Sequence, residues 1–471
     1  MKTSYKVFAL CVFVSNGIYL YWLFFHIMGI AGVLLFMAEA LIVSLTLLFI
    51  LNHWTARRLP RRNICLIESS LDIFIPVVDE PVAMIEKTLA ETVNIRFPAK
   101  KIYLLDDGPY HHGLIKRNLC HRYGATYLGR AEQINAKAGN LNYGLSESHG
   151  DFILVLDADQ VPYPDIAESV MQYFAENSRL AFITFRQQFD VPPDDFNHDI
   201  LFYEHMQTGK DIDNSAVSTG SGVIYRRYAL DAIGGFQTWN IVEDLYTSYI
   251  FHRMGWKSLY INTPATLGTA PLDLRSIYKQ RGNWALDTFR LFFRRSPFLV
   301  KGLSFRQRLH YTETAWAYLV SAIAIPILFT LPALSLFLTL FIIDEPQTYV
   351  LLRTPSLLLI LIFYYELSGK TFSCGQFWAS LSFVYLKALF LSVLPGKPTY
   401  RVTKKLAGPN RRDIFLIIPH LLFVILGLSA VFWRIFLHDH MVTFFTAVNF
   451  LWISLMVFWF VPIIRKGFLL E

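Results

Sequence analysis

The stretch that decides the fold spans residues 151–160 and reads DFILVLDADQ. Its apolar run, FILVL, has the length and composition of a strand that is buried on both faces of a sheet. Two carboxylates follow at once, those of Asp157 and Asp159. Ligands of open α/β sheets bind beyond the carboxyl ends of the strands, so both acids stand where a bound group would meet them.

The alternation of Asp157 and Asp159 lets both side chains turn towards one ion. Carboxylate oxygens are ligands that Mg²⁺ and Mn²⁺ prefer, and such an ion usually takes phosphate oxygens and water as well. A solvated surface turn is the simpler alternative, because a lone D-x-D is common. The apolar strand before the motif, and a second acidic strand end upstream, favour a metal site.

Three further apolar runs look like strands, with helical patterns between them. They cover residues 71–78, 101–108 and 179–189. The first ends close to Glu80, and the second ends in Asp106 and Asp107. Several strands that deliver polar residues to one sheet edge indicate a site rather than a packing pattern. The sequence therefore predicts a Rossmann-like α/β domain with a ligand at this edge.

Three other short segments carry candidate ligand contacts. Lys137 can meet a phosphate at a loop-to-helix junction, although a surface lysine at a helix start is the simpler alternative. Gly220 and Ser221 are small, so the backbone there can approach a ligand closely. Glu243 and Asp244 open a predicted helix, where acids also suit the helix dipole. Asp244 is the candidate general base.

The segment KQRGNW, residues 279–284, brings a glutamine, an arginine and a tryptophan together. Such side chains can stack on and hydrogen-bond to a flat polar group such as a sugar. Gln280 and Trp284 are the candidate sugar contacts.

The composition is too apolar for an ordinary soluble enzyme, with 54% hydrophobic residues. The excess lies in the first fifty residues and after about residue 310, so a soluble domain is expected between two membrane regions. The net charge of +7 fits basic residues that flank membrane spans, and no nucleic-acid motif accompanies it. The four cysteines are far apart, which fits reduced thiols in a cytosolic domain.

Six segments are long and apolar enough to cross a hydrocarbon core of roughly 30 Å. They are Val7–Phe25, Met28–Leu51, Ala315–Ile343, Val350–Tyr365, Ile414–Phe436 and Val442–Ile464. The third contains Pro326 and Pro332, and we interpret it as one long span rather than a hairpin. We interpret Phe377–Leu394 as an amphipathic helix that lies in the membrane interface.

Clusters of arginine and lysine follow the second span, precede the third, and recur around residues 397–412 and 465–466. The positive-inside rule then places the middle domain and both termini in the cytoplasm, with the protein in the inner (plasma) membrane. The expected units are an N-terminal hairpin over 1–56, a catalytic domain over 65–300, and interfacial helices with four spans over 301–471.

Taken in order, these residues resemble the membrane-integrated processive family 2 glycosyltransferases of the cellulose synthase type. Their pattern is D-D-G, K-A-G-N, D-x-D, a Gly-Ser acceptor loop, T-E-D and Q-x-x-R-W. It reads here Asp106–Gly108, Lys137–Asn140, Asp157–Asp159, Gly220-Ser221, Val242–Asp244 and Gln280–Trp284. Residues 397–405 look like the family's F-x-V-T-x-K gating loop. The resemblance implies a GT-A fold inserted between transmembrane helices.

The resemblance also implies what each residue does. The nucleotide-sugar donor would be bound by Glu80, Asp106, Asp107, Lys137, Asp157 and Thr403. Asp157 and Asp159 would hold Mg²⁺ or Mn²⁺, and Asp244, with Glu243 beside it, would deprotonate the acceptor hydroxyl. The acceptor would be bound by Gly220, Ser221, Gln280 and Trp284.

Departures from the family pattern bear on the prediction. Val242 replaces the threonine of T-E-D, and Asn283 replaces the arginine of Q-x-x-R-W. That arginine would bind the donor diphosphate. An asparagine keeps a hydrogen-bond donor but lacks the positive charge and the paired N–H groups with which a guanidinium binds two oxygens at once. We expect no cyclic-di-GMP-binding (PilZ) domain, because the sequence stops just after the sixth span.

The predicted function is an inverting, metal-dependent transfer of a sugar from a nucleotide sugar to a growing β-glycan that is exported across the membrane. UDP-glucose is the first guess for the donor, from resemblance alone. Membrane lipids and export partners in the periplasm complete the expected surroundings. One alternative is a non-processive transferase that modifies a lipid or short acceptor, and another is a transporter or scaffold with a dead transferase domain.

Overall fold

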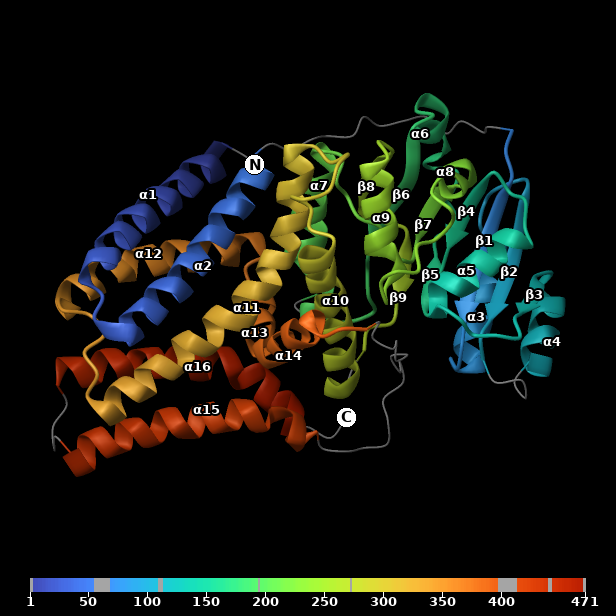
Figure 1. Cartoon of the computed structure of the whole chain (residues 1–471). Coiled ribbons are helices and arrows are strands. Elements are labelled where there is room, and N and C mark those ends of the chain that lie inside the picture. The colour runs from blue at the N-terminus through green and yellow to red at the C-terminus, as the bar shows by residue number, and fades with distance from the viewer. Residues whose placement is uncertain are drawn as a thin grey trace.

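The computed structural model describes residues 3–54, 68–108, 113–193, 195–271, 273–396, 413–438 and 443–468. Figure 1 shows a domain built around a sheet on one side and a bundle of long helices on the other, with helix α10 (Leu274–Arg294) between them. The first and last helices of the chain both belong to the bundle, and the sheet is formed by the middle of the sequence.

The main sheet has seven strands in the order β3-β2-β1-β4-β7-β6-β8. Its strands are β1 (Leu71–Val77), β2 (Lys100–Asp106), β3 (Thr126–Gly129), β4 (Phe152–Val155), β6 (Leu180–Arg186), β7 (Val223–Arg226) and β8 (Lys257–Pro264). Strands β1 to β4 are parallel, β7 runs antiparallel to both of its neighbours, and β6 and β8 are parallel. The mixed sheet confirms the predicted α/β fold.

All four predicted strands are present, and the stretch DFILVLDADQ is divided. Residues Phe152–Val155 form β4, and Gln160–Pro162 form β5, which pairs with β9 (Thr266–Gly268) in a separate sheet. The chain adds β2 and β3 on one side of β1 and then returns to place β4 on the other side. The carboxyl ends of β1 and β4 therefore flank a topological switch point, where ligands of such sheets bind.

Both faces of the sheet are covered by apolar packing. Leu71, Ile73 and Ile75 point to one face of β1, where they join the side chains of α3 (Val82–Val93). Phe74 points to the other face and packs with Leu141 of α5 (Ala136–Ser146). The alternation follows from the two-residue period of a strand, and the long apolar run reflects burial on both faces.

The remaining helices of this domain are short and lie around the sheet. They are α4 (Gly113–Tyr123), α6 (Met171–Glu176), α7 (Gln207–Ile212), α8 (Arg227–Ala232) and α9 (Glu243–Arg253), with the 3₁₀ turn η2 (Phe196–His198) and the π-helix η3 (Leu201–Met206). Helix α10 is longer and carries the segment KQRGNW.

Six helices of the described chain are long and apolar enough to cross a membrane. They are α1 (Thr3–His26), α2 (Gly29–His53), α11 (Phe305–Leu338), α12 (Pro346–Leu367), α15 (Ile414–Phe432) continued by η4 (Trp433–His438), and α16 (Phe444–Phe468). Each matches one predicted span. Helix α11 is continuous through Pro326 and Pro332, so the third segment is one span and not a hairpin.

The interfacial segment differs from its prediction. The sequence predicts one helix over Phe377–Leu394, and the structure has two, α13 (Ser373–Ser380) and α14 (Ser382–Val393), bent by 47°. Taken together they are apolar and long enough to count as a seventh span. They pack on α10 and α16 instead of lying free, because Phe377, Leu381 and Tyr385 bury their side chains against α10 and its neighbours.

Candidate functional site

A cavity of about 360 Å³ opens where β1 and β4 end. Its walls are formed by these strand ends, by α5, by the loop before β7, by the start of α9 and by the middle of α10. It is lined by Pro76, Val78, Glu80, Asp107, Gln133, Ala136, Lys137, Asn140, Asp157, Ala158, Asp159, Thr219, Gly220, Ile241, Val242, Glu243, Asp244, Gln280, Asn283 and Trp284. Most of the residues singled out in the sequence therefore meet around one space.

Lys137 is the only lysine or arginine among the described residues that line this cavity. Its Nζ lies 2.7 Å from Asp157 Oδ1 and 3.2 Å from Glu243 Oε1, and it donates to the carbonyl of Gly220 at 2.8 Å. Burial alone would lower the pKa of Lys137, but the Asp157 and Glu243 carboxylates raise it well above its usual value. The ammonium is therefore charged and ties β4, α9 and the glycine loop together.

Asp244 stands in the first turn of α9 and reaches into the same cavity. Burial, followed by the neighbouring Glu243 carboxylate, raises the pKa of Asp244 to about 8. Gly220 has φ +77°, and a Cβ there would lie 2.8 Å from Asp244 Oδ2. A glycine is required at this position for two reasons, since both the backbone conformation and the carboxylate exclude a side chain.

Asp157 and Asp159 follow β4 and face the cavity with different exposure. The Asp157 side chain is 38% exposed, whereas Asp159 is buried. The Asp157 N–H donates to Ser221 Oγ at 2.8 Å, which fixes the turn from behind. Burial raises the pKa of Glu80, and the nearby Asp157 and Asp159 carboxylates raise it further. Three carboxylates thus gather at the switch point.

The carboxylates at the switch point determine whether a divalent ion fits there. Within the described residues, no group of three or more histidine, cysteine, aspartate or glutamate side chains is arranged to hold a metal. Two carboxylates from one strand end, beside an open cavity, match an ion that takes its other ligands from phosphate and water. The residues fit Mg²⁺ or Mn²⁺ bound together with a diphosphate, and they do not form a closed structural site.

The D-D-G motif divides between two environments. Asp106 is buried beneath the cavity, where it pairs with Lys116 of α4 at 2.5 Å and accepts from Tyr127 Oη at 2.8 Å. Asp107 lines the cavity and is gripped by the guanidinium of Arg130, with Nη2 2.6 Å from Oδ2. The structure therefore places Asp107, and not Asp106, in reach of a ligand.

Helix α10 turns three residues of KQRGNW towards the cavity. Gln280, Asn283 and Trp284 share one face at spacings of three and four residues, and all line the cavity. Arg281 points away and is buried against Asp199, with Nη1 2.5 Å from Oδ2. Arg281 therefore does not supply the cavity with the charge that is missing at Asn283.

Comparison with known proteins follows the same division of the chain. A sequence model of glycosyl transferase family 2 matches residues 72–234, and a model of cellulose synthase matches residues 232–385. The chain therefore contains a glycosyl transferase family 2 region followed by a cellulose synthase region, and it is a glycosyltransferase. The second match begins at the end of α8 and ends in α14, so it includes the parts of α9 and α10 that line the cavity.

The relatives of this glycosyltransferase include bacterial cellulose synthase subunits. The transferase is 29% identical over 427 residues to cellulose synthase 1 catalytic subunit (UDP-forming) of Komagataeibacter xylinus, covering 84% of this chain and 56% of the relative. It is 31% identical over 255 residues to the cellulose synthase catalytic subunit (UDP-forming) of Xanthomonas axonopodis pv. citri, covering 51% of this chain and 34% of the relative. The transferase thus spans about half or less of the length of these relatives.

A solved structure resembles the transferase in fold. It is a mannosyltransferase from Pyrobaculum calidifontis, determined in complex with GDP-Man and Mn²⁺. The TM-score is 0.57 at 17% identity, and the match covers 76% of this chain and 98% of that one. This likeness supports the GT-A fold of the domain.

Several supporting residues of the transferase were missed by sequence reasoning. Lys116 and Arg130 hold the two aspartates of the D-D-G motif, and Gln187 donates to the carbonyl of Ser221 at 2.8 Å. Ser221 is buried and braces the turn at Asp157, so it lies behind the cavity and does not line it. No local motif marks these residues, because their partners are distant in sequence. Thr403 and the gating-like loop lie outside the described residues.

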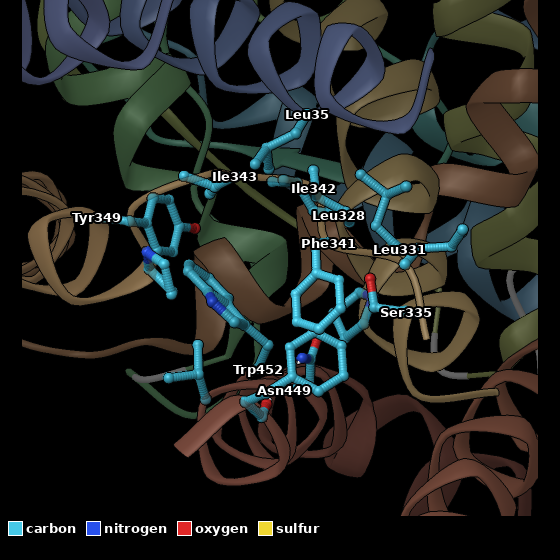
Figure 2. A pocket seen from close by; sticks show the side chains of 15 residues that line it. Leu35, Leu328, Leu331, Ser335, Phe341, Ile342, Ile343, Tyr349, Asn449 and Trp452 are labelled. Carbon is cyan, nitrogen blue, oxygen red and sulfur yellow. Dashed lines mark hydrogen bonds between the residues drawn. The ribbon is translucent and has the colours of Figure 1, made fainter. Parts of the chain in front are cut away.

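Two further cavities lie in the helix bundle of the transferase. The larger, of about 270 Å³, lies among α2, α11, α12, α13 and α16 and is lined by aromatic and apolar side chains together with Asp199, Glu313 and Arg353. The smaller, of about 80 Å³, is shown in Figure 2, where Tyr349, Phe341 and Asn449 surround it. Leu328 and Trp452 line both, so the two cavities adjoin.

Proposed function

We propose that this transferase moves a sugar from a nucleotide sugar onto a hydroxyl group of a growing β-glycan, with inversion at the anomeric carbon. The observation that carries the proposal is the single cavity that unites Asp157 and Asp159, Lys137, Asp244 and Trp284. These residues supply in one space a metal-binding edge, a cation, a base and an aromatic platform.

The donor end of the proposed site lies at the ends of β1 and β4. Asp157 and Asp159 would hold Mg²⁺ or Mn²⁺, which when bound would offset the charge of the leaving diphosphate. Lys137 would bind a phosphate oxygen, and Glu80 and Asp107 would contact the nucleoside. UDP-glucose is the proposed donor, and the relatives named as UDP-forming cellulose synthase subunits support it.

The acceptor end of the proposed site lies between α9 and α10. Trp284 would stack under the acceptor sugar, with Gln280 beside it. Asp244 would take the proton of the attacking hydroxyl, and the bond from the anomeric carbon to the diphosphate would break as the new glycosidic bond forms. One base is enough for direct displacement, so an α-linked donor gives a β-linked product.

Export is the second part of the proposal. The bundle cavity has tryptophan side chains, Trp378, Trp452 and Trp459, on which sugar rings can stack. It adjoins the smaller cavity, since Leu328 and Trp452 line both. We further propose that residues 65–300 and both termini are cytoplasmic, that 1–56 and 301–471 form the membrane region, and that the basic clusters fix this orientation in the inner membrane.

The test is release of nucleoside diphosphate by the purified protein from a panel of nucleotide sugars, with linkage and length analysis of the product. We expect one donor to be turned over, with Mg²⁺ or Mn²⁺ present, into a long β-linked chain. Asp244→Asn should abolish transfer, and Glu86→Gln, which is half-buried against Arg122 of α4 and lies outside the cavity, should not. Products no longer than a mono- or disaccharide adduct would contradict polymerisation, and full activity of Asp244→Asn would contradict its assignment as the base.

A further inference from the structure

A buried ion pair connects a residue that lines the bundle cavity to a residue that lines the reaction cavity. Asp199 lines the bundle cavity, and Trp284 lines the reaction cavity. Arg281 stands between them, with Nη1 2.5 Å from Asp199 Oδ2 and its guanidinium carbon 4.9 Å from the centre of the Trp284 ring. One side chain therefore contacts the wall of each cavity.

The pair is enclosed on the remaining sides. Asp199 and Arg281 are 5% and 3% exposed. The guanidinium also lies 5.1 Å from the ring centre of Phe377 in α13, which stacks on Phe196 at 3.7 Å. Aromatic rings from α10, α13 and η2 thus surround a charged contact between residues that line or touch the two cavities.

The backbone at Asp199 is held in an uncommon conformation. Its φ is +40°, in the left-handed region that few residues other than glycine adopt. It ends the 3₁₀ turn η2, and the π-helix η3 begins two residues later. Strained residues and π-helical turns both concentrate at functional sites, because such geometry persists only where the surroundings enforce it.

Stability alone gives little reason for such a pair. Replacing a buried ion pair with apolar residues of similar size is often neutral or stabilising, since desolvating two charges is costly. What an ion pair does provide is a fixed geometry. Here the guanidinium on Trp284 restricts the tilt of the ring, while the bond to Asp199 ties that ring to the mouth of the bundle cavity.

We propose that Asp199 and Arg281 are positioning residues that join the acceptor platform to the entrance of the bundle cavity and so determine product length. This inference rests on the proposed function. Neither residue contacts the reacting atoms. The pair aligns Trp284 with the entrance, so that the end of the glycan stays registered on the platform while the rest of the chain passes Asp199 into the bundle.

The experiment compares mean product length with the rate of nucleoside diphosphate release, in full-length protein with the preferred donor. Asp199→Asn keeps the shape and tolerates the left-handed backbone, and it removes the charge that holds Arg281. We expect mean product length to fall by at least about tenfold, the ratio that about 1.4 kcal/mol produces, with a smaller change in release rate.

A double variant separates positioning from folding. Asp199→Asn with Arg281→Gln replaces the ion pair with an uncharged hydrogen-bonding pair and leaves no unpaired buried charge. We expect its melting temperature to exceed that of Asp199→Asn while its product stays short, because the cation on Trp284 is gone. Asp72→Asn is the matched control, since Asp72 pairs with Arg227 inside the domain at 3.1 Å and touches neither cavity.

Three results would overturn the inference. They are wild-type product length in Asp199→Asn, recovery of that length in the double variant, and equal shortening in Asp72→Asn, which would mark a general effect of destabilisation. Failure of the proposed function would show itself separately, as a wild-type protein that releases no nucleoside diphosphate from any nucleotide sugar.

Discussion

At the scale of single residues, the cavity is dominated by acids. Glu80, Asp157, Asp159, Glu243 and Asp244 all line it. Lys137 opposes them, and Asp107 is already compensated by Arg130. A donor diphosphate is itself an anion, so the balance of charge in this space decides how well it binds. Both residue-scale predictions follow from that balance.

The first concerns Asn283, which stands at the position of the arginine in the Q-x-x-R-W pattern, where an arginine is expected to meet the diphosphate. Its side chain faces the cavity beside Gln280 and Trp284, so an arginine there would reach the donor. We expect Asn283→Arg to be tolerated and to lower the KM for the donor by about tenfold or more, since a hydrogen bond to a charged group contributes about 1.5–3 kcal/mol and about 1.4 kcal/mol is a tenfold change.

Steady-state kinetics with the nucleotide sugar would measure this effect. Asn283→Met is the control, because it matches arginine in length without the charge and should give no gain in affinity. A clear loss of activity in Asn283→Arg would mean that the cavity is shaped for a different donor or acceptor.

The second concerns pH. Burial and Glu243 raise the pKa of Asp244 to about 8, and a general base acts only when it is unprotonated. kcat/KM should therefore rise with pH and level off above about 8. Glu243→Gln removes the repulsion that favours the protonated form, so the pKa of Asp244 should fall and the rising limb should move to lower pH.

The pH dependence of kcat/KM, measured from about pH 6 to about pH 10, reports the free enzyme and so tests this directly. Glu86→Gln, which pairs with Arg122 of α4 and lies outside the cavity, should leave the rising limb at the same pH. If Glu243→Gln also leaves it unmoved, the titrating base is another group.

Residue identity was more predictable than residue placement. Acids at strand ends and a tryptophan on a helix could be assigned to one site because strand polarity and helical spacing are local properties. The split between Asp106 and Asp107 could not be predicted, since it depends on Lys116 and Arg130, which come from separate elements. Ser221 shows the same limit, because only the packed turn reveals that it supports Asp157 from behind.

At the scale of elements, one buried ion pair joins α2 to α12 inside the bundle. Arg353 Nε lies 2.9 Å from Glu39 Oε1, and both side chains are buried. The guanidinium also lies over the ring of Tyr19 in α1, so three membrane helices meet at this contact. Charges within membrane spans are costly unless they are paired, so removing one partner should be worse than removing both.

We expect Arg353→Met to lower the free energy of unfolding by about 3–5 kcal/mol, because it leaves the Glu39 carboxylate buried without its partner. The double variant Glu39→Met with Arg353→Met should recover most of that loss. Thermal unfolding of the detergent-solubilised protein would measure both. Arg275→Met is the control, since the Arg275 side chain is 69% exposed and its contact with Asp413, at 3.4 Å, should matter little. Equal loss in the single and double variants would show that packing, and not charge, holds these helices.

Some element boundaries can be predicted from the sequence pattern alone, and others cannot. The six spans were predictable because continuous apolar length is their defining property. The bend between α13 and α14 was not, because Leu381 is buried from several sides and tertiary packing selects the break. The π-helix η3 has no sequence signature of its own.

At the scale of the whole molecule, orientation in the membrane is the open prediction. The described loop between α11 and α12 holds Asp344 and Glu345, whereas Lys301 lies before α11 among other basic residues. The positive-inside rule therefore puts residue 301 in the cytoplasm and residue 344 on the opposite side.

A membrane-impermeant maleimide applied to intact spheroplasts should label Asp344→Cys above the level of the parent protein. Lys301→Cys should be labelled only after lysis. Both side chains are accessible in the fold, with Asp344 49% exposed and Lys301 exposed, so protection would reflect the membrane and not burial. The reverse pattern would place the reaction cavity outside the cell, away from nucleotide sugars.

The two ion pairs of Lys137 have a consequence for repeated catalytic cycles. In the proposed reaction, a phosphate must replace Asp157 and Glu243 as the partner of the Lys137 ammonium. Binding of the phosphate is therefore an exchange of ion-pair partners and does not add a new ion pair. The same two carboxylates recapture the ammonium when the spent nucleotide loosens. The two carboxylates compete with the spent nucleotide for Lys137 and so increase the rate at which that nucleotide dissociates. Fast dissociation frees the donor site for the next sugar, which an enzyme that adds many sugars in succession requires.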